Sequence, residues 1–338
     1  MTAHGSAATG RSLWRAEDPE TFDATVLTAA EQLRVQPLAV EKDYWVCEAL
    51  RAIQAAYPDA VIFKGGTSLE KIRLVQRFSE DLDLLITGEF GGAGATKSAL
   101  RRMCEAARAA VDGTLTDEKS GGTLGTMHRR AYLHPPLVQQ SSSSGAIADP
   151  HRVLLELGQS GGKHPSSSRE ITSLLTRQLQ ASGFPVADFA DLTPFTVQVL
   201  HPGRTLLEKL LRINNFASAE DARRDVHGWP RIGRQFYDVW ALLGSPEVLD
   251  FLADVGQVAA VLNDCYQVST LFVPDEPLPA GGFAESSAFD ASGSLAGRLR
   301  EEHDAAMRDL YYGTSPAPTF DEVLTRVREH AELLNIVM

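Results

Sequence analysis

Apolar side chains in the first half of the chain follow two patterns, one with nearly helical spacing and one made of short continuous runs. The helical spacing, which predicts amphipathic helices, covers residues 23–33, 41–56 and 96–111. The short runs, which predict strands, cover residues 60–63, 82–86, 126–133 and 152–157. Strands and helices that alternate in this way indicate an α/β or α+β fold with a small mixed sheet flanked by helices.

The second half of the chain carries helix-length patterns almost throughout. They cover residues 173–181, 205–215, 232–243, 248–268, 296–311 and 320–334. Residues 158–168 are rich in Gly, Ser and Pro and predict a linker, whereas residues 274–294 predict a mobile surface loop. We therefore expect a flexible N-terminus over residues 1–22, an α/β domain over 23–160 and a mainly helical domain over 161–338.

Composition and charge narrow the class of protein. The chain has 338 residues, enough for two domains, and a net charge of −12, which argues against nonspecific coating of nucleic acid. No apolar run approaches the ~20 residues of a membrane span, and no secretory signal is visible at the N-terminus. The three cysteines lack metal-ligand spacing. These features predict a cytoplasmic protein without membrane contact.

The candidate chemistry lies in the first strand, the turn after it and the next strand. Strand 60–63 leads into Gly65-Gly-Thr-Ser68, where the glycines would let a phosphate approach backbone N–H groups. A short helix ending near Val75 follows. Asp81 and Asp83 then come two residues apart in an extended segment, so both point to one side of the sheet. Two carboxylates held so close usually bind a divalent cation.

These motifs resemble the nucleotidyltransferase superfamily, whose pattern is a Gly-Gly turn, a short helix and Asp-hydrophobic-Asp-hydrophobic. The closer resemblance is to the AbiEii/AbiGii-type nucleotidyltransferase toxins, which include the MenT group. It rests on five segments in family order: Val40-Glu-Lys-Asp-Tyr-Trp45, Lys64-Gly-Gly-Thr-Ser-Leu69 with Lys71, Arg77-Phe-Ser-Glu-Asp-Leu-Asp83, Leu206-Leu-Glu-Lys209 and Arg234-Gln-Phe-Tyr-Asp238. The matches span about residues 40 to 243.

The resemblance implies a site with metal-binding, phosphate-binding and catalytic residues. Asp81 and Asp83 would bind Mg²⁺, or Mn²⁺, with a third carboxylate from the neighbouring strand. Glu156 is the candidate because it is the one charge in Val153-Leu-Leu-Glu-Leu157, although a strand-edge glutamate facing water is the alternative. The residues expected to bind the nucleotide are Lys64, Gly65, Gly66, Thr67, Ser68, Lys71, Arg77, Ser79 and Lys209.

Lys209 and Asp238 would come to the site from the helical domain. By resemblance, Lys209 is the essential lysine that offsets charge on the leaving pyrophosphate. Asp238 is expected to hold Lys209 or the substrate, while an exposed ion pair with Arg234 is the simpler alternative. The expected catalytic residues are thus Asp81, Asp83, Lys209 and Asp238.

The function that the resemblance implies is that of a toxin in a type IV-like bacterial toxin–antitoxin system. Such an enzyme would transfer a nucleoside monophosphate from an NTP, with a pyrimidine preferred, to the 3′ end of tRNA and so block translation. Its partners would be the NTP, tRNA and a cognate antitoxin. Two alternatives keep the same scaffold: transfer to a protein side chain, and a catalytically silent nucleotide-binding protein.

Overall fold

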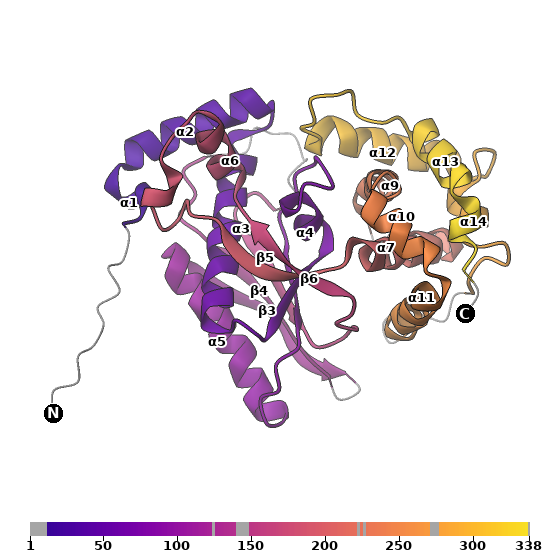
Figure 1. The fold of residues 1–338 in the computed structure, drawn as a ribbon, viewed down its shortest axis with the longest axis horizontal. Coiled ribbons are helices and arrows are strands. Elements are labelled where there is room, and N and C mark those ends of the chain that lie inside the picture. The colour runs from indigo at the N-terminus through magenta and orange to yellow at the C-terminus, as the bar shows by residue number, and fades with distance from the viewer. Residues whose placement is uncertain are drawn as a thin grey trace.

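The computed structural model describes residues 12–123, 126–139, 149–221, 224–225, 228–270 and 277–336. Within these residues, seven strands form one mixed sheet in the order β3-β4-β5-β2-β1-β7-β6. The sheet and its helices make up one side of the molecule, and the C-terminal helices form the other (Figure 1). The prediction of a mixed α/β fold is confirmed.

The strands are β1 (Val61–Lys64), β2 (Leu82–Ile86), β3 (Thr114–Thr123), β4 (Thr126–His134), β5 (Val153–Gly158), β6 (Ser166–Ile171) and β7 (Phe195–Leu200). The helices of the sheet side are α1 (Trp14–Glu17), α2 (Pro19–Leu33), α3 (Pro37–Ala56), α4 (Gly65–Lys71), α5 (Ala93–Val111) and α6 (Leu174–Ala181), with the 3-10 turn η1 (Val186–Asp188). Those of the other side are α7 (Pro202–Ser218), α9 (Trp229–Leu242), α10 (Pro246–Ala253), α11 (Val255–Thr270), α12 (Ala296–Leu310), α13 (Phe320–Glu329) and α14 (Ala331–Leu334), with the 3-10 turns η2 (Phe283–Glu285) and η3 (Ser287–Phe289).

The centre of the sheet is built from the two strands that carry the candidate chemistry. β2 pairs antiparallel with β1 and parallel with β5, while β1 also pairs parallel with β7. In β2 the side chains alternate, so Leu82 and Leu84 enter the core and Asp83 points to the opposite face. One face of β2 therefore packs in the core, and the other carries a charged residue of the candidate site.

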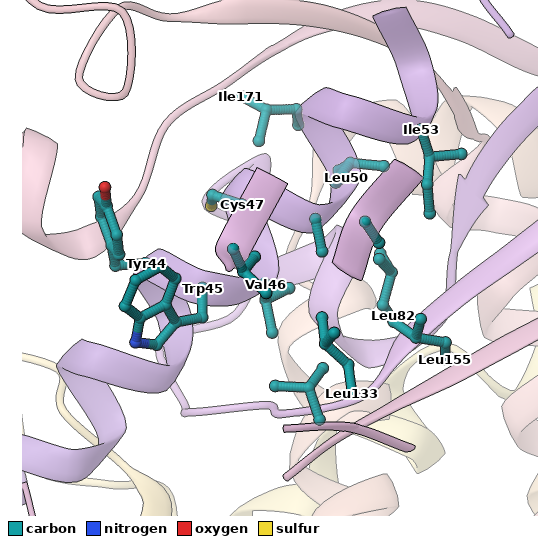
Figure 2. Close-up of a cluster of buried hydrophobic side chains, with 14 of the residues drawn as sticks. Tyr44, Trp45, Val46, Cys47, Leu50, Ile53, Leu82, Leu133, Leu155 and Ile171 are labelled. Carbon is teal, nitrogen blue, oxygen red and sulfur yellow. The ribbon is translucent and has the colours of Figure 1, made fainter. Parts of the chain in front are cut away.

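The main hydrophobic core lies between α3 and the sheet (Figure 2). Its labelled members are Tyr44, Trp45, Val46, Cys47, Leu50 and Ile53 of α3, Leu82, Leu133 and Leu155 of the central strands, and Ile171 of β6. All are nearly inaccessible to solvent. Burial of each large side chain contributes about 1.5–3 kcal/mol, so this core fixes the position of β2 and of its charged face.

A second core holds the C-terminal helices together. Leucines of α7 pack against aromatic residues of α9, including Phe236. Leu69 of α4 and Val75 belong to this core as well, so the short helix after the Gly-Gly turn is anchored in the helical side. No helix among the described residues is long and apolar enough to cross a membrane.

Several expectations differ from the structure. The sheet continues beyond residue 160, where we predicted a domain boundary, because β7 pairs with β1 and β6 pairs with β7. Residues 14–22, predicted to be flexible, instead form α1 and the start of α2, with Trp14 buried, while residues 1–11 lie outside the described residues. The predicted mobile loop also packs: from residue 277 onward it carries η2 and η3, which bury Phe283 and Phe289.

Candidate active site

A row of four charged residues crosses the centre of the sheet on the face opposite the main core. Lys64 of β1 lies directly opposite Asp83 of β2, Asp83 opposite Glu156 of β5, and Glu156 opposite Arg130 of β4. Directly paired residues project to the same face, so the four side chains are neighbours. Glu156 Oε1 is 2.7 Å from Arg130 Nε. The expected meeting of Asp83 with Glu156 is therefore present, and Glu156 lies on a central strand, not at a sheet edge.

The two acids in the middle of this row interact strongly. Burial, together with the charge of Glu156 and a hydrogen bond to it, raises the pKa of Asp83 to about 7. Lys64 and Arg234 act in the opposite sense but are outweighed. Two carboxylates in contact need either a shared proton or a cation between them, so this pair has the chemistry of a metal or proton site.

Asp81 directly precedes β2, beside the turn. Its carbonyl oxygen accepts a hydrogen bond of 2.6 Å from the Thr67 hydroxyl, which also lies 2.9 Å from Ser79 Oγ. Its carboxylate is 3.9 Å from Arg234 Nη2. Burial and the nearby charge of Asp83 raise the pKa of Asp81. Thr67 thus ties the glycine turn to the acidic strand through hydrogen bonds within the protein.

The two glycines of the turn allow charged side chains of the site to approach the backbone. Gly65 has a φ of +80°, which favours glycine, and a Cβ there would overlap the Asp83 carboxylate. A Cβ at Gly66 would lie 2.6 Å from Arg77 Nη2. The role of the glycines in phosphate binding stays a prediction, but the close approach of Asp83 and Arg77 already requires the absence of side chains here.

Asp238 of α9 joins the sheet side to the helical side. Its two carboxylate oxygens accept hydrogen bonds of 2.6 Å from Arg77 Nε and Nη2, and Lys209 Nζ lies 2.6 Å from Oδ2. Burial alone would raise the pKa of Asp238, but Arg77 and Lys209 outweigh it and hold the pKa below its ordinary value. Lys209 Nζ also donates to Gln235 Oε1 at 2.7 Å. Asp238 therefore orients Lys209, as expected, and is not the partner of an exposed Arg234.

Three arginines of the helical side face the acids, and the sequence analysis did not assign them to the site. Arg234 approaches Asp81, and both Arg212 and Arg231 interact electrostatically with the acidic group. Burial and the nearby Arg77 lower the pKa of Arg234. Its Nε is buried and has no hydrogen-bond partner among the residues described. Helical spacing could have revealed them, because Arg212 lies one turn from Lys209 and Arg234 one turn from Asp238.

Lys71 lies in a different, fully buried network, away from the row of charges. Its ammonium contacts Asp43 of α3 and is 2.7 Å from Glu70 Oε2. Lys42 of the same α3 segment pairs with Glu80 at 2.5 Å. Through these two ion pairs, residues 40–45 of α3 support α4 and the residues that precede β2. They argue against direct contact of Lys71 with a nucleotide.

Two more of the expected nucleotide-binding residues are engaged within the protein. Ser68 is buried and donates its hydroxyl to the Gly65 carbonyl oxygen at 2.8 Å. Arg77 is 1% exposed and fully occupied by Asp238 and the Phe78 carbonyl. Both support the turn and Lys209 rather than presenting free groups to a ligand.

Carboxylate oxygens are the ligands that Mg²⁺ and Mn²⁺ prefer. Asp83 and Glu156 supply them on one face of the sheet, and the charge of Asp83 also acts on Asp81. Among the residues that the structure describes, no three His, Cys, Asp or Glu side chains already converge as a metal site. The contact between Asp83 and Glu156 nevertheless fits a bound cation, because a cation would replace the shared proton. The metal set stays a prediction that the donor chemistry supports.

Comparisons with known proteins place this geometry in a family. The model of a family described as nucleotidyl transferase AbiEii toxin, type IV TA system, matches residues 48–326. Among solved structures, JHP933 from Helicobacter pylori is 12% identical, with 85% of this chain and 94% of that chain covered and a TM-score of 0.31. A putative nucleotidyltransferase from H. pylori is 14% identical, with 77% and 94% covered and a TM-score of 0.28.

TM-scores this low carry no argument about fold or function, and no curated protein matches the chain. The family match is different, because it spans most of the chain and contains the whole charged row together with Lys209 and Asp238. The expected family is thus confirmed: the chain belongs to the AbiEii family of toxins in type IV toxin–antitoxin systems and is a nucleotidyltransferase.

Proposed function

We propose that the protein transfers a nucleoside monophosphate from an NTP, preferably a pyrimidine nucleotide, to the 3′ end of tRNA and thereby stops translation. The observation that carries this proposal is the pairing of two charged surfaces. Asp83 and Glu156 lie on the sheet, while Arg234 and Arg212 face the acids from the helical side. Lys209 lies behind them, held by Asp238 and within the field of Arg234. Such a site offers oxygen ligands for a cation beside cationic groups for a triphosphate.

Each charged group has a distinct role in the proposed reaction. Asp81, Asp83 and Glu156 would hold Mg²⁺ or Mn²⁺, and the bound cation would supply Lewis-acid polarisation of phosphate oxygens. Lys209, held by Asp238, would stabilise negative charge on the pyrophosphate leaving group. Arg234 has a buried Nε without a partner among the described residues, and we assign it to the same triphosphate.

The proposal is tested by incubating the protein with each labelled NTP, total tRNA and total cell protein, with and without a chelator. We expect label at the 3′ end of tRNA, loss of labelling on chelation, and recovery with Mg²⁺ or Mn²⁺. Asp83→Ala should abolish labelling, whereas Asp304→Ala, at an exposed position on α12, should leave it unchanged. Label that enters protein and never RNA would overturn the tRNA assignment in favour of protein modification.

Membership of a type IV toxin–antitoxin family implies a cognate antitoxin as a further partner. Expression of the toxin alone should arrest growth, and the Asp83→Ala variant should not. Growth arrest that persists in this variant, without label in any acceptor, would instead indicate a catalytically silent binding protein.

A further inference from the structure

A cavity of about 460 Å³ lies at the C-terminal end of α4, the helix whose N-terminal end forms the glycine turn of the active site. It lies where three segments meet: residues 73–76 after α4, the residues of α6 from 177 to 181, and Tyr312 after the end of α12. Its lining residues are Arg73, Val75, Gln76, Arg177, Gln180, Ala181 and Tyr312. None of them belongs to the charged row or to the Lys209 group, so the cavity is a separate feature.

The wall beneath the cavity is a buried cluster whose charges are internally balanced. Glu70 accepts from Arg177 Nη1 at 2.9 Å and from the Tyr312 hydroxyl, and it also contacts Lys71, which pairs with Asp43. Two carboxylates thus face two cations, and no charge of this cluster is left over. Arg177 and Tyr312 line the cavity, with the Arg177 guanidinium and the Tyr312 hydroxyl held by Glu70.

Arg73 adds a positive charge that nothing in the described part of the chain balances. It is exposed, and none of the described side chains forms an ion pair or hydrogen bond with its guanidinium. Its φ of +63° places it in the left-handed region just after Ile72, the C-cap of α4, where glycine is the usual residue. The cavity therefore carries a surplus of one positive charge in a chain whose net charge is −12.

The remaining lining residues fit a nucleotide better than a bare anion. The side-chain amides of Gln76 and Gln180 each have a hydrogen-bond donor and an acceptor. Such amides can form paired hydrogen bonds with the edge of a nucleobase. Ala181 supplies exposed apolar surface at the rim, while Val75 is buried beneath it in the second core. The volume is within the range of small-molecule sites, roughly 300–1,000 Å³, and exceeds what a phosphate alone requires.

We propose that this cavity binds a nucleoside monophosphate unit, either as a free nucleotide or as one residue of an RNA strand, with its phosphate on Arg73. The cavity is connected to the active site through the backbone. Gln76 accepts from Tyr312 N at 3.0 Å and donates from its own N–H to the Tyr237 hydroxyl at 2.8 Å. The next residue, Arg77, holds Asp238. An occupied cavity would therefore restrain the segment that positions Lys209.

The test uses Arg73→Gln with Arg34→Gln as its matched control. Arg34 is also an exposed arginine with a positive φ, +58°, directly after a helix, so both variants make the same change of charge on the same backbone conformation. Each protein is titrated by calorimetry with the four nucleoside 5′-monophosphates, and by fluorescence anisotropy with a labelled RNA hairpin that ends in a single-stranded 3′ tail. Binding is measured without transfer, so the outcome is independent of the proposed reaction.

A free-nucleotide site predicts one more bound nucleotide for wild type and for Arg34→Gln than for Arg73→Gln, whatever the active site binds. An RNA site predicts about tenfold weaker hairpin binding by Arg73→Gln, with the slope of log K against log salt reduced by about 0.7, the value for one lost phosphate contact on a single strand. The proposal is overturned if Arg73→Gln matches Arg34→Gln in both stoichiometry and RNA affinity.

Discussion

Replacing Gly66 by alanine should destabilise the protein, although the same change elsewhere in a helix usually stabilises it. The new Cβ would lie 2.6 Å from Arg77 Nη2, and ordinary contacts begin at 3.4 Å, so Arg77 must retreat by about 0.8 Å. Its two hydrogen bonds to Asp238 are 2.6 Å long, and a retreat of this size takes them beyond the range of strong charge-assisted bonds. Removing a partner from a buried ion pair costs about 3–5 kcal/mol, and we expect about 2 kcal/mol for weakening this one.

The matched control is Gly297→Ala. Gly297, like Gly66, is the second residue of its helix, but nothing lies within 4 Å of a Cβ there. This variant should gain up to about 1 kcal/mol, because alanine has the higher helix propensity. Urea unfolding followed by circular dichroism measures both variants. The reasoning fails if Gly66→Ala is as stable as wild type or more stable, because Arg77 would then have room to move without losing Asp238.

Two further predictions concern the buried carboxylates. Asp238→Asn should lower the free energy of unfolding by about 3–5 kcal/mol, because Arg77 and Lys209 lose their shared anion. Asp321→Asn, at a surface aspartate with similar two-bond arginine pairing, should have a much smaller effect in the same urea titration. In metal-free protein, the pKa of Asp83 is raised to about 7 from 3.8, so the folded state keeps a proton that the unfolded state releases. Stability should therefore fall as the pH rises from about 4 to about 7, and Asp83→Asn should remove that part of the pH dependence. An unchanged pH profile in Asp83→Asn would show that another group causes it.

The central strands and the acids could be predicted from the sequence because local patterns determine them. Strand 82–86 was predicted with the bounds it has, and the alternation of Leu82, Asp83 and Leu84 assigns Asp83 to the face opposite the core. Glu156 was found because one charge among aliphatic residues needs a partner. Its position opposite Asp83 could not be predicted from local sequence, because β5 is about 70 residues from β2 in the chain and pairs with it only in the folded sheet.

The predictions that differed from the structure depended on contacts between distant residues. β6 is mostly polar and overlaps the predicted linker, and its pairing with β7 makes it a strand. β7 alternates apolar Val197 and Val199 with exposed Thr196 and Gln198, a signal that the sequence analysis left unassigned, and it pairs with β1. Lys71 and Arg77 lie within family motifs, and a motif alone does not distinguish a residue that binds the nucleotide from one that supports such a residue. Burial decides this here, since both side chains are 1% exposed and already paired.

The distribution of charge makes the active site depend on packing between the two sides of the molecule. Arg77 follows α4 on the sheet side and would be a buried cation without a partner if Asp238 of α9 were absent. Asp238, in turn, is shared with Lys209 of α7, so two buried cations depend on one anion. Because breaking any one of these contacts leaves a buried charge unpaired, intermediate arrangements are unstable. Lys209 is therefore correctly placed only when the two sides are packed together, and changes in that packing should alter nucleotide transfer before they unfold the chain.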